Sequence, residues 1–271
     1  MAAPSKTRSP LRLIEGLGRG TASSIQAFGF GAHLFFQSLY WVLMGRRVHQ
    51  TVHAEPIFAQ MMVIGVRAIP IVSMLSVAIG ITLSMQGIDS LEQFGAQHQV
   101  IFMVALSVTR EFGPLITGIL VAGRSGSALA ARISTMTISQ EVDALKVMGI
   151  NPVRYIVVPS LTGMMIVLPA LTLWSICVAL IGSAIFVTPQ LGTTLGAYLT
   201  QVNASIGADD LAHGLLKSLI FAVLITIVAV VDGTSVEGGA EGVGRVTTSA
   251  VVHGISAIVV TDMIFVFAAT A

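Results

Sequence analysis

Long apolar runs separated by short polar stretches form the main pattern of this chain. Residues 68–88 carry no charge, and residues 99–123 are apolar except for Arg110 and Glu111 near their middle. A helix needs about 20 mostly apolar residues to cross the hydrocarbon core of a membrane. The pattern therefore predicts five transmembrane helices, at about 64–88, 98–132, 154–187, 209–232 and 246–270.

An earlier run, residues 21–44, is also long enough to cross, but basic residues lie on both sides of it. Basic residues next to membrane segments favour the cytoplasmic face, so a crossing would leave one basic set on the opposite face. We therefore expect an interfacial or re-entrant helix in this run, with a sixth span as the alternative. This divides the chain into an N-terminal helical segment, residues 1–60, and a membrane domain, residues 61–271.

Composition supports the same fold class. Hydrophobic residues make up 54% of the chain and charged residues 10%, with a mean hydropathy of +0.88. Soluble domains carry about 25% charged residues, so this chain could not cover a water-exposed surface, and we expect an all-α integral membrane protein. A net charge of +1 offers no basic field for nucleic acid. Cys177 lies within an apolar run and is expected to be a small buried residue.

The distribution of basic residues predicts the orientation. Of 14 Lys and Arg residues, seven lie between Lys6 and Arg67 and five between Arg110 and Arg154. Residues 88–99 and 188–210 contain none, but they carry four acidic residues, Asp89, Glu92, Asp209 and Asp210. Because basic loops stay inside, five spans place the N-terminus on the cytoplasmic side and the C-terminus on the outer side of the membrane.

The segment between the second and third spans predicts a short amphipathic coupling helix, about residues 137–149. Thr137 and Gln140 fit a capping box, and Gly149 can end the helix in the left-handed conformation. Apolar residues at positions 138, 142, 145 and 148 form one stripe. The helix lies either on the bilayer surface or against a cytoplasmic partner. Glu141 and Asp143 favour docking, since helices that bind lipid surfaces are usually rich in Lys and Arg.

Catalytic and nucleotide-binding motifs are incomplete. The segment GRSGS, residues 123–127, has Ser127 where a nucleophile elbow needs glycine. In GAEGVGRV, residues 239–246, Arg245 and Val246 replace the Lys and Ser/Thr of a phosphate loop. The six His residues show no metal-ligand spacing. We therefore expect no enzyme activity, metal site or cofactor in this chain.

Four ionisable residues fall within or near the predicted spans: Arg110, Glu111, Lys217 and Asp262. Such residues are costly in hydrocarbon, usually face a bundle interior or a water-filled cavity, and often mark a substrate path. Lys217 and Asp262 are predicted at comparable depth, so they can meet. Two interpretations stay open here: a substrate path, or internal pairs that only fix helix packing.

Three segments together resemble the MlaE/YrbE permeases of MCE-type lipid transport systems. They are REFGPLITGILVAGRSGSALAARISTM, EVDALKVMGINPVRYIVVP, and GGAEGVGRVTTSAVVHG followed by TDMIFV, within residues 60–270. The resemblance implies a permease subunit of an ATP-binding cassette transporter that moves phospholipid or a related lipid between the inner and outer membranes. It implies a second permease copy or paralogue, a separate ATPase that holds ATP and Mg²⁺, an MCE-domain protein on the outer side, and a small accessory protein on the ATPase.

The resemblance also assigns roles to particular residues. The family motif R-E-[LF]-G-P corresponds to residues 110–114. Residues implied near the lipid cavity are Leu83, Met85, Gln86, Arg110, Glu111, Lys217 and Asp262. Residues implied in ATPase coupling are Glu141, Asp143, Leu145 and Met148. The alternatives are an ion- or proton-coupled secondary transporter that uses the charged residues as a relay, and a non-transporting membrane scaffold.

Overall fold

The computed structural model describes residue 26 and residues 29–41 and 54–270, and this part of the chain is helical and contains no strand. Residues 29–41 form the first described helix. The other elements are α2 (Ala54–Met61), η1 (Met62–Val66), α3 (Ile69–Glu92), η2 (Gln97–Gln99), α4 (Val100–Ser107), η3 (Val108–Phe112), α5 (Gly113–Val121), η4 (Ala122–Gly126), α6 (Ser127–Ile138), α7 (Glu141–Val147), η5 (Val153–Val157), α8 (Val158–Gln190), α9 (Leu195–Ser205), α10 (Ala208–Thr234) and α11 (Ala240–Thr270).

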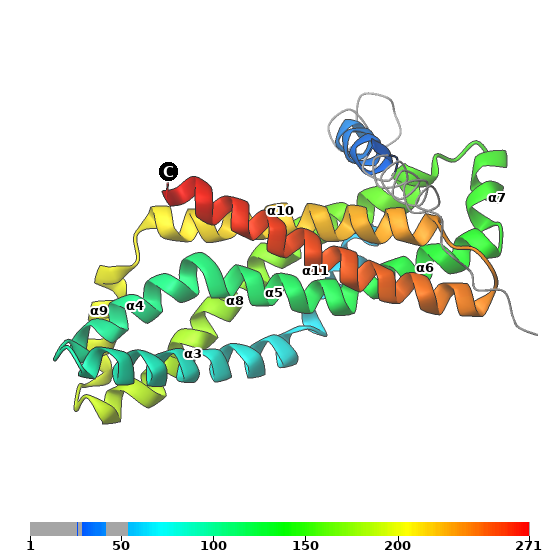
Figure 1. The fold of residues 1–271 in the computed structure, drawn as a ribbon. Coiled ribbons are helices and arrows are strands. Elements are labelled where there is room, and N and C mark those ends of the chain that lie inside the picture. Colours follow the sequence, from blue (N-terminus) through cyan, green and yellow to red (C-terminus); the bar gives the residue numbers. More distant parts are fainter. Residues whose placement is uncertain (1–25, 27–28, 42–53, 271) are drawn as a thin grey trace, which may run out of the picture.

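Five helices of the described residues are long and apolar enough to cross a membrane, which confirms the predicted number. They cover Glu55–Glu92, Gln97–Ile138, Val153–Gln190, Ala208–Thr234 and Ala240–Ala268. Figure 1 shows α9 and α7 at opposite ends of this bundle, with the C-terminus toward the α9 end. We refer to the two ends of the molecule as the α9 end and the α7 end.

The second span is longer than its apolar pattern indicates. It runs for 42 residues, from Gln97 to Ile138, which at about 1.5 Å per residue is roughly twice the thickness of a hydrocarbon core. In its last turns the Thr135 and Thr137 hydroxyls donate to the carbonyls of Ala131 and Ile133, both at 2.9 Å, so these polar groups are satisfied within the helix. The helix therefore projects beyond the membrane toward α7.

Two pairs of buried serines join α3 to α8. Ser76 and Ser175 share a hydrogen bond of 2.8 Å, and the Ser84 hydroxyl donates to that of Ser183 at 2.7 Å. The two serines of each helix are eight positions apart, so they lie on one face. Hydroxyl pairs of this kind hold helices together in a membrane, where apolar burial between helices gives little driving force.

Small residues between these serines allow the backbones to touch. A Cβ atom at Gly80 would overlap the carbonyl oxygen of Ala179, and one at Gly182 would lie 2.6 Å from the carbonyl oxygen of Val77. Neither position can hold a larger residue without moving a helix. This close α3–α8 contact fixes the first span against the third.

Helix α10 packs parallel to the second span in the same manner. Near the α9 end, Gly214 faces the carbonyl of Thr109, and a Cβ atom there would overlap it. Near the α7 end, the Ser134 hydroxyl donates to the carbonyl of Gly233 at 3.1 Å. Contact at both ends fixes the register between these helices, and this register sets which polar side chains meet between them.

The polar connection after the third span contains a helix that the sequence pattern did not predict. Helix α9 begins after Thr194, whose hydroxyl accepts a hydrogen bond from the amide of Ala197 at 3.2 Å. The Tyr198 side chain is buried and donates to the carbonyl of Leu180 at 3.0 Å. Burial raises the pKa of this phenol, so it remains a donor.

The predicted capping box of the coupling helix is wrong. Helix α6 continues through Ile138, and the Thr137 hydroxyl bonds back to Ile133 instead of capping the next helix. The chain then turns at Gln140, which has a φ of 60°, and α7 begins at Glu141. Because Ile138 belongs to α6, it is not part of the predicted stripe. The predicted end is confirmed: Gly149 has a φ of 76°.

Two further predictions concern the run 21–44 and the burial of Cys177. The run 21–44 lies partly outside the described residues; its described part, residues 29–41, is helical, with Leu34 and Ser38 buried. Cys177 was predicted to be buried but is exposed on the surface of α8. An apolar surface of a membrane helix can face lipid as well as protein, so hydropathy could not distinguish these two environments.

Candidate functional site

A cluster of charged side chains joins three spans of the apolar bundle, in its α9 half. It joins η3, α10 and α11 and consists of Arg110, Glu111, Asp210, Lys217 and Asp262. We call these five residues the charged cluster. Four of them were predicted from the sequence, and the structure brings those four together with Asp210.

Lys217 is the centre of the charged cluster, and its side chain has no solvent exposure. Its ammonium group pairs with the Glu111 carboxylate and lies 3.0 Å from Oδ1 of Asp262. The contact with Asp262 is an ion pair by distance, without hydrogen-bond geometry. The ammonium also lies 5.9 Å from the ring centre of Phe265, within the range of a cation–π interaction. One buried cation thus ties three helices together, as the comparable depth of Lys217 and Asp262 predicted.

Arg110 pairs with Asp210, a residue that the sequence analysis had placed in an outer stretch. Nε and Nη2 of Arg110 both lie 2.5 Å from Oδ1 of Asp210. The other oxygen of Asp210 accepts the amide of Gly207 at 2.8 Å, so it also caps the start of α10. From the sequence, the position of Asp210 in the first turn of a helix indicated that this carboxylate caps the helix. Its pairing with Arg110 could not be predicted, because it depends on how the helices pack.

The local backbone at Arg110 and Glu111 departs from α-helix geometry. Residues Val108–Phe112 form a π-helical turn, in which the amide of Gly113 bonds to the carbonyl of Val108. Pro114 follows directly and has no amide hydrogen, so it cannot make the regular helical bond there. Single π turns of this kind are frequent at functional sites. The motif REFGP therefore creates both the charged pair and the irregular turn that carries it.

The three predicted cavity residues on α3 are not part of the charged cluster. Leu83 is half-buried and packs against a core group that contains Val104 and Val108. Met85 and Gln86 are exposed on the surface of the chain. Within the described residues, no hydrogen bond or ion pair links Gln86 to the cluster. The structure therefore separates an interior charged group from an exposed α3 surface.

The α7 region presents a second candidate surface at the opposite end. A hollow of 630 Å³ between α6 and α7 is lined by Glu141, Leu145 and Met148, among others. Leu145 is only 8% exposed and packs into the core, so it forms the floor of the hollow. Glu141 and Met148 are exposed. Asp143 is exposed too and pairs with Lys146 on the same helix, at 2.8 Å.

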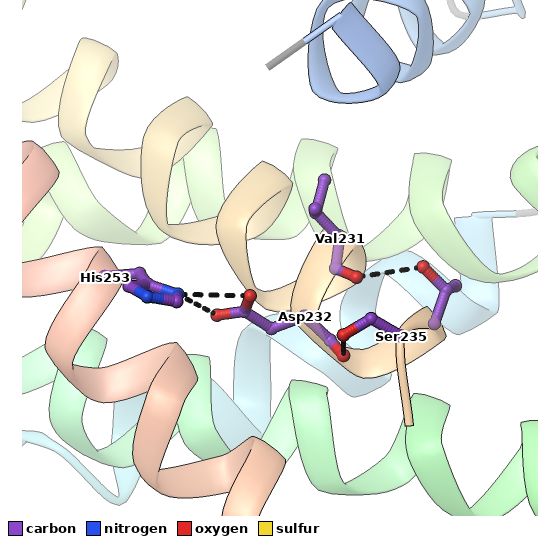
Figure 2. Close-up of polar contacts among 5 residues, drawn as sticks. Val231, Asp232, Ser235 and His253 are labelled. Carbon is purple, nitrogen blue, oxygen red and sulfur yellow. Dashed lines mark hydrogen bonds and ion pairs between the residues drawn. The ribbon is translucent and has the colours of Figure 1, made fainter. Parts of the chain in front are cut away.

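A further polar contact joins α10 to α11 in the α7 half of the bundle. Figure 2 shows His253 directed at Asp232, with Nδ1 at 2.9 and 3.2 Å from the two carboxylate oxygens. His253 is 61% exposed, whereas Asp232 is 15% exposed. This contact bridges the two helices at a surface. It forms no part of the charged cluster.

Two kinds of catalytic site are not formed by the described residues. Within the described residues, no group of three His, Cys, Asp or Glu side chains could hold a metal ion. The segment GRSGS lies in helix, partly in the π turn η4, where Ser125 is buried. A strand–turn–helix nucleophile elbow is therefore not formed there.

Five apolar spans with ion pairs between them are the architecture of an integral membrane permease. Permease MlaE is the family that matches, over residues 57–268. The chain belongs to this family, as the sequence resemblance indicated.

Individual relatives cover nearly the whole chain. A probable ABC transporter permease protein of Rickettsia typhi is 31% identical over 260 residues, which is 94% of this chain and 98% of that protein. The intermembrane phospholipid transport system permease protein MlaE of Haemophilus influenzae is 29% identical over 260 residues, 96% of this chain and 97% of that protein. The chloroplastic protein TRIGALACTOSYLDIACYLGLYCEROL 1 of Arabidopsis thaliana is 30% identical over 200 residues, 74% of this chain and 57% of that protein.

Proposed function

We propose that this chain is the permease subunit of an ATP-binding cassette transporter that moves phospholipid or a related lipid between membranes. The observation that carries the proposal is the charged cluster, which joins three spans of an otherwise apolar bundle around the fully buried Lys217. Ionisable groups in spans are retained mainly where they line a path or hold a substrate. The similarity to an intermembrane phospholipid transport permease supports phospholipid as the class of substrate.

The cluster offers a polar position for a lipid headgroup beside apolar surfaces for acyl chains. Arg110 has 46% of its side chain exposed even while it pairs with Asp210, and Glu111 is 34% exposed. These two groups can therefore reach a ligand, whereas Lys217 is enclosed and holds them in place. In this proposal Leu83 and Met85 on α3 contribute an apolar approach and Gln86 a polar contact beside it, completed by a second permease copy or paralogue.

The proposed orientation places α7 in the cytoplasm and the C-terminus in the periplasm of a bacterial inner membrane. It rests on the bias of basic residues toward the α7 end. The exposed residues of α7 then face a separate cytoplasmic ATPase, which binds ATP and Mg²⁺ and to which a small accessory protein attaches. An MCE-domain protein meets the α9 end. This chain itself binds no cofactor in the proposal.

A reconstitution experiment tests the transport function. The tagged full-length chain is purified from its native membrane, associated proteins are identified by mass spectrometry, and the complex is reconstituted with a fluorescent phospholipid in liposomes. We expect lipid movement that requires ATP and is lost when Glu111→Gln or Lys217→Met is introduced. Movement driven by an ion gradient without an ATPase would identify a secondary transporter. Transport that survives both substitutions would indicate a scaffold.

A second experiment tests the docking surface on α7. Glu141→Ala and Met148→Ala are expected to reduce recovery of the ATPase with the permease, while the permease keeps its yield and its unfolding temperature. Asn203→Ala, at an exposed position on α9, is the matched control at the opposite end. Leu145→Ala is expected to lower stability because Leu145 is buried. Full ATPase recovery in both α7 surface variants would contradict the assignment.

A further inference from the structure

A cavity in the α7 half of the bundle combines three arginines with an apolar wall. It has a volume of 430 Å³ and lies between α2, η1, α6 and the start of α8. Its basic lining residues are Arg67, Arg124 and Arg132, and none of the described residues that line it carries a carboxylate. It is separate from the charged cluster, because Arg124 lies 14 positions after Arg110 in the same span, about 20 Å along the helix.

The arginines of this cavity lack acidic partners within the described residues. None of the three forms an ion pair there, and Nη1 of Arg124 is buried without a hydrogen-bond acceptor. A buried guanidinium nitrogen that has no acceptor destabilises the protein unless a ligand supplies one. Phosphate accepts paired hydrogen bonds from arginine, so a cavity lined by three arginines suits a phosphate-bearing ligand.

The depth of the cavity favours a lipid as the source of that phosphate. Arg110 lies near the middle of the apolar run of the second span, and Arg132 lies 22 positions further along the same helix, toward the α7 end. Basic residues next to a membrane span favour the headgroup region of the inner leaflet. Arg67 lies between η1 and α3, within the first span.

The rest of the lining is suited to the glycerol and upper acyl region of a lipid. Val63, Ile64, Leu129 and Met164 form apolar wall, and Ala128 is exposed in it. A soluble anion would gain nothing from these side chains. We propose that this cavity binds the phosphate group of a membrane phospholipid from the leaflet at the α7 end of the bundle.

Site-specific crosslinking tests this assignment. A photoreactive side chain is placed at Ala128, and the full-length protein in detergent is illuminated with phosphatidylglycerol. We expect a lipid adduct at this position at least tenfold stronger than at Val147, an exposed control position on α7. Diacylglycerol, which lacks the phosphate, is expected to give only the control signal. Equal adducts with diacylglycerol and phosphatidylglycerol would overturn the proposal.

Substitution of the three arginines tests whether they hold the lipid phosphate. The triple variant Arg67→Gln, Arg124→Gln, Arg132→Gln is expected to lose the adduct at least tenfold, and Arg245→Gln, an exposed arginine outside the cavity, is expected to keep it. If the triple variant aggregates, Arg124→Lys preserves the charge and is expected to give a partial loss, since lysine cannot make the paired contact. An unchanged adduct in these variants contradicts the proposal.

Competition distinguishes the two sources of phosphate. A large excess of inorganic phosphate is expected to leave most of the lipid adduct in place, because it cannot use the apolar wall. Complete displacement would show that the cavity is a site for a soluble phosphate, and the lipid assignment would be wrong. These readouts measure binding and not ATP-driven movement, so their failure leaves the proposed transport function untouched.

Discussion

Replacement of Lys217 by methionine isolates the contribution of charge at the centre of the cluster. Methionine keeps an unbranched chain of similar length, so packing around the aliphatic part of Lys217 changes little. The ammonium disappears, and the carboxylates of Glu111 and Asp262 lose the cation between them. The perturbation is therefore electrostatic, in a position with no solvent exposure.

The expected cost follows from the burial of the remaining carboxylates. Loss of one partner from a buried ion pair costs about 3–5 kcal/mol. Asp262 is 15% exposed, but Glu111 is 34% exposed and can be partly solvated. We therefore expect Lys217→Met to lower the free energy of unfolding by about 3 kcal/mol, the lower end of that range. The triple variant Lys217→Met, Glu111→Gln, Asp262→Asn removes the stranded charges and is expected to recover most of the loss.

Unfolding in mixed micelles, followed by circular dichroism, measures these differences. Lys146→Met is the control, because the Lys146–Asp143 pair is exposed on both sides and exposed pairs contribute about 0–1 kcal/mol. The reasoning is refuted if Lys217→Met unfolds like the wild-type protein. It is refuted equally if the triple variant is no more stable than Lys217→Met alone, since the loss would then come from packing.

Three further predictions concern the contacts between helices, measured as folded yield or free energy of unfolding. Gly80→Leu should prevent α3 from packing on α8 and reduce folded yield in size-exclusion chromatography, whereas Gly244→Ala, with open space around it, should be neutral or slightly stabilising; similar yields for both would contradict the close contact. A double-mutant cycle of Ser76→Ala and Ser175→Ala should give a coupling of about 0.6 kcal/mol in micelle unfolding, and zero coupling would remove the hydrogen bond from the account. His253→Gln should change the free energy of unfolding by less than about 1 kcal/mol because the imidazole is exposed; a larger loss would show that the α10–α11 bridge matters.

Some features of this protein could be predicted from the sequence because they depend on local properties. Crossing a membrane requires a long apolar run, so hydropathy alone indicated all five spans. The end of the coupling helix at Gly149 was predictable since few residues other than glycine adopt a positive φ. The meeting of Lys217 and Asp262 followed from equal depth, because an unpaired charge in hydrocarbon is strongly disfavoured.

Other features depended on how the helices pack. Asp210 looked like part of an outer acidic stretch, and only the register between α10 and the second span places it on Arg110. Leu145 looked like a docking residue, and only contact with the core makes it the floor of a hollow. Hydropathy describes one segment at a time and assigns no neighbours. Partners in this bundle are set by the rotation and register of each helix, and close contacts such as Gly80 on Ala179 fix both.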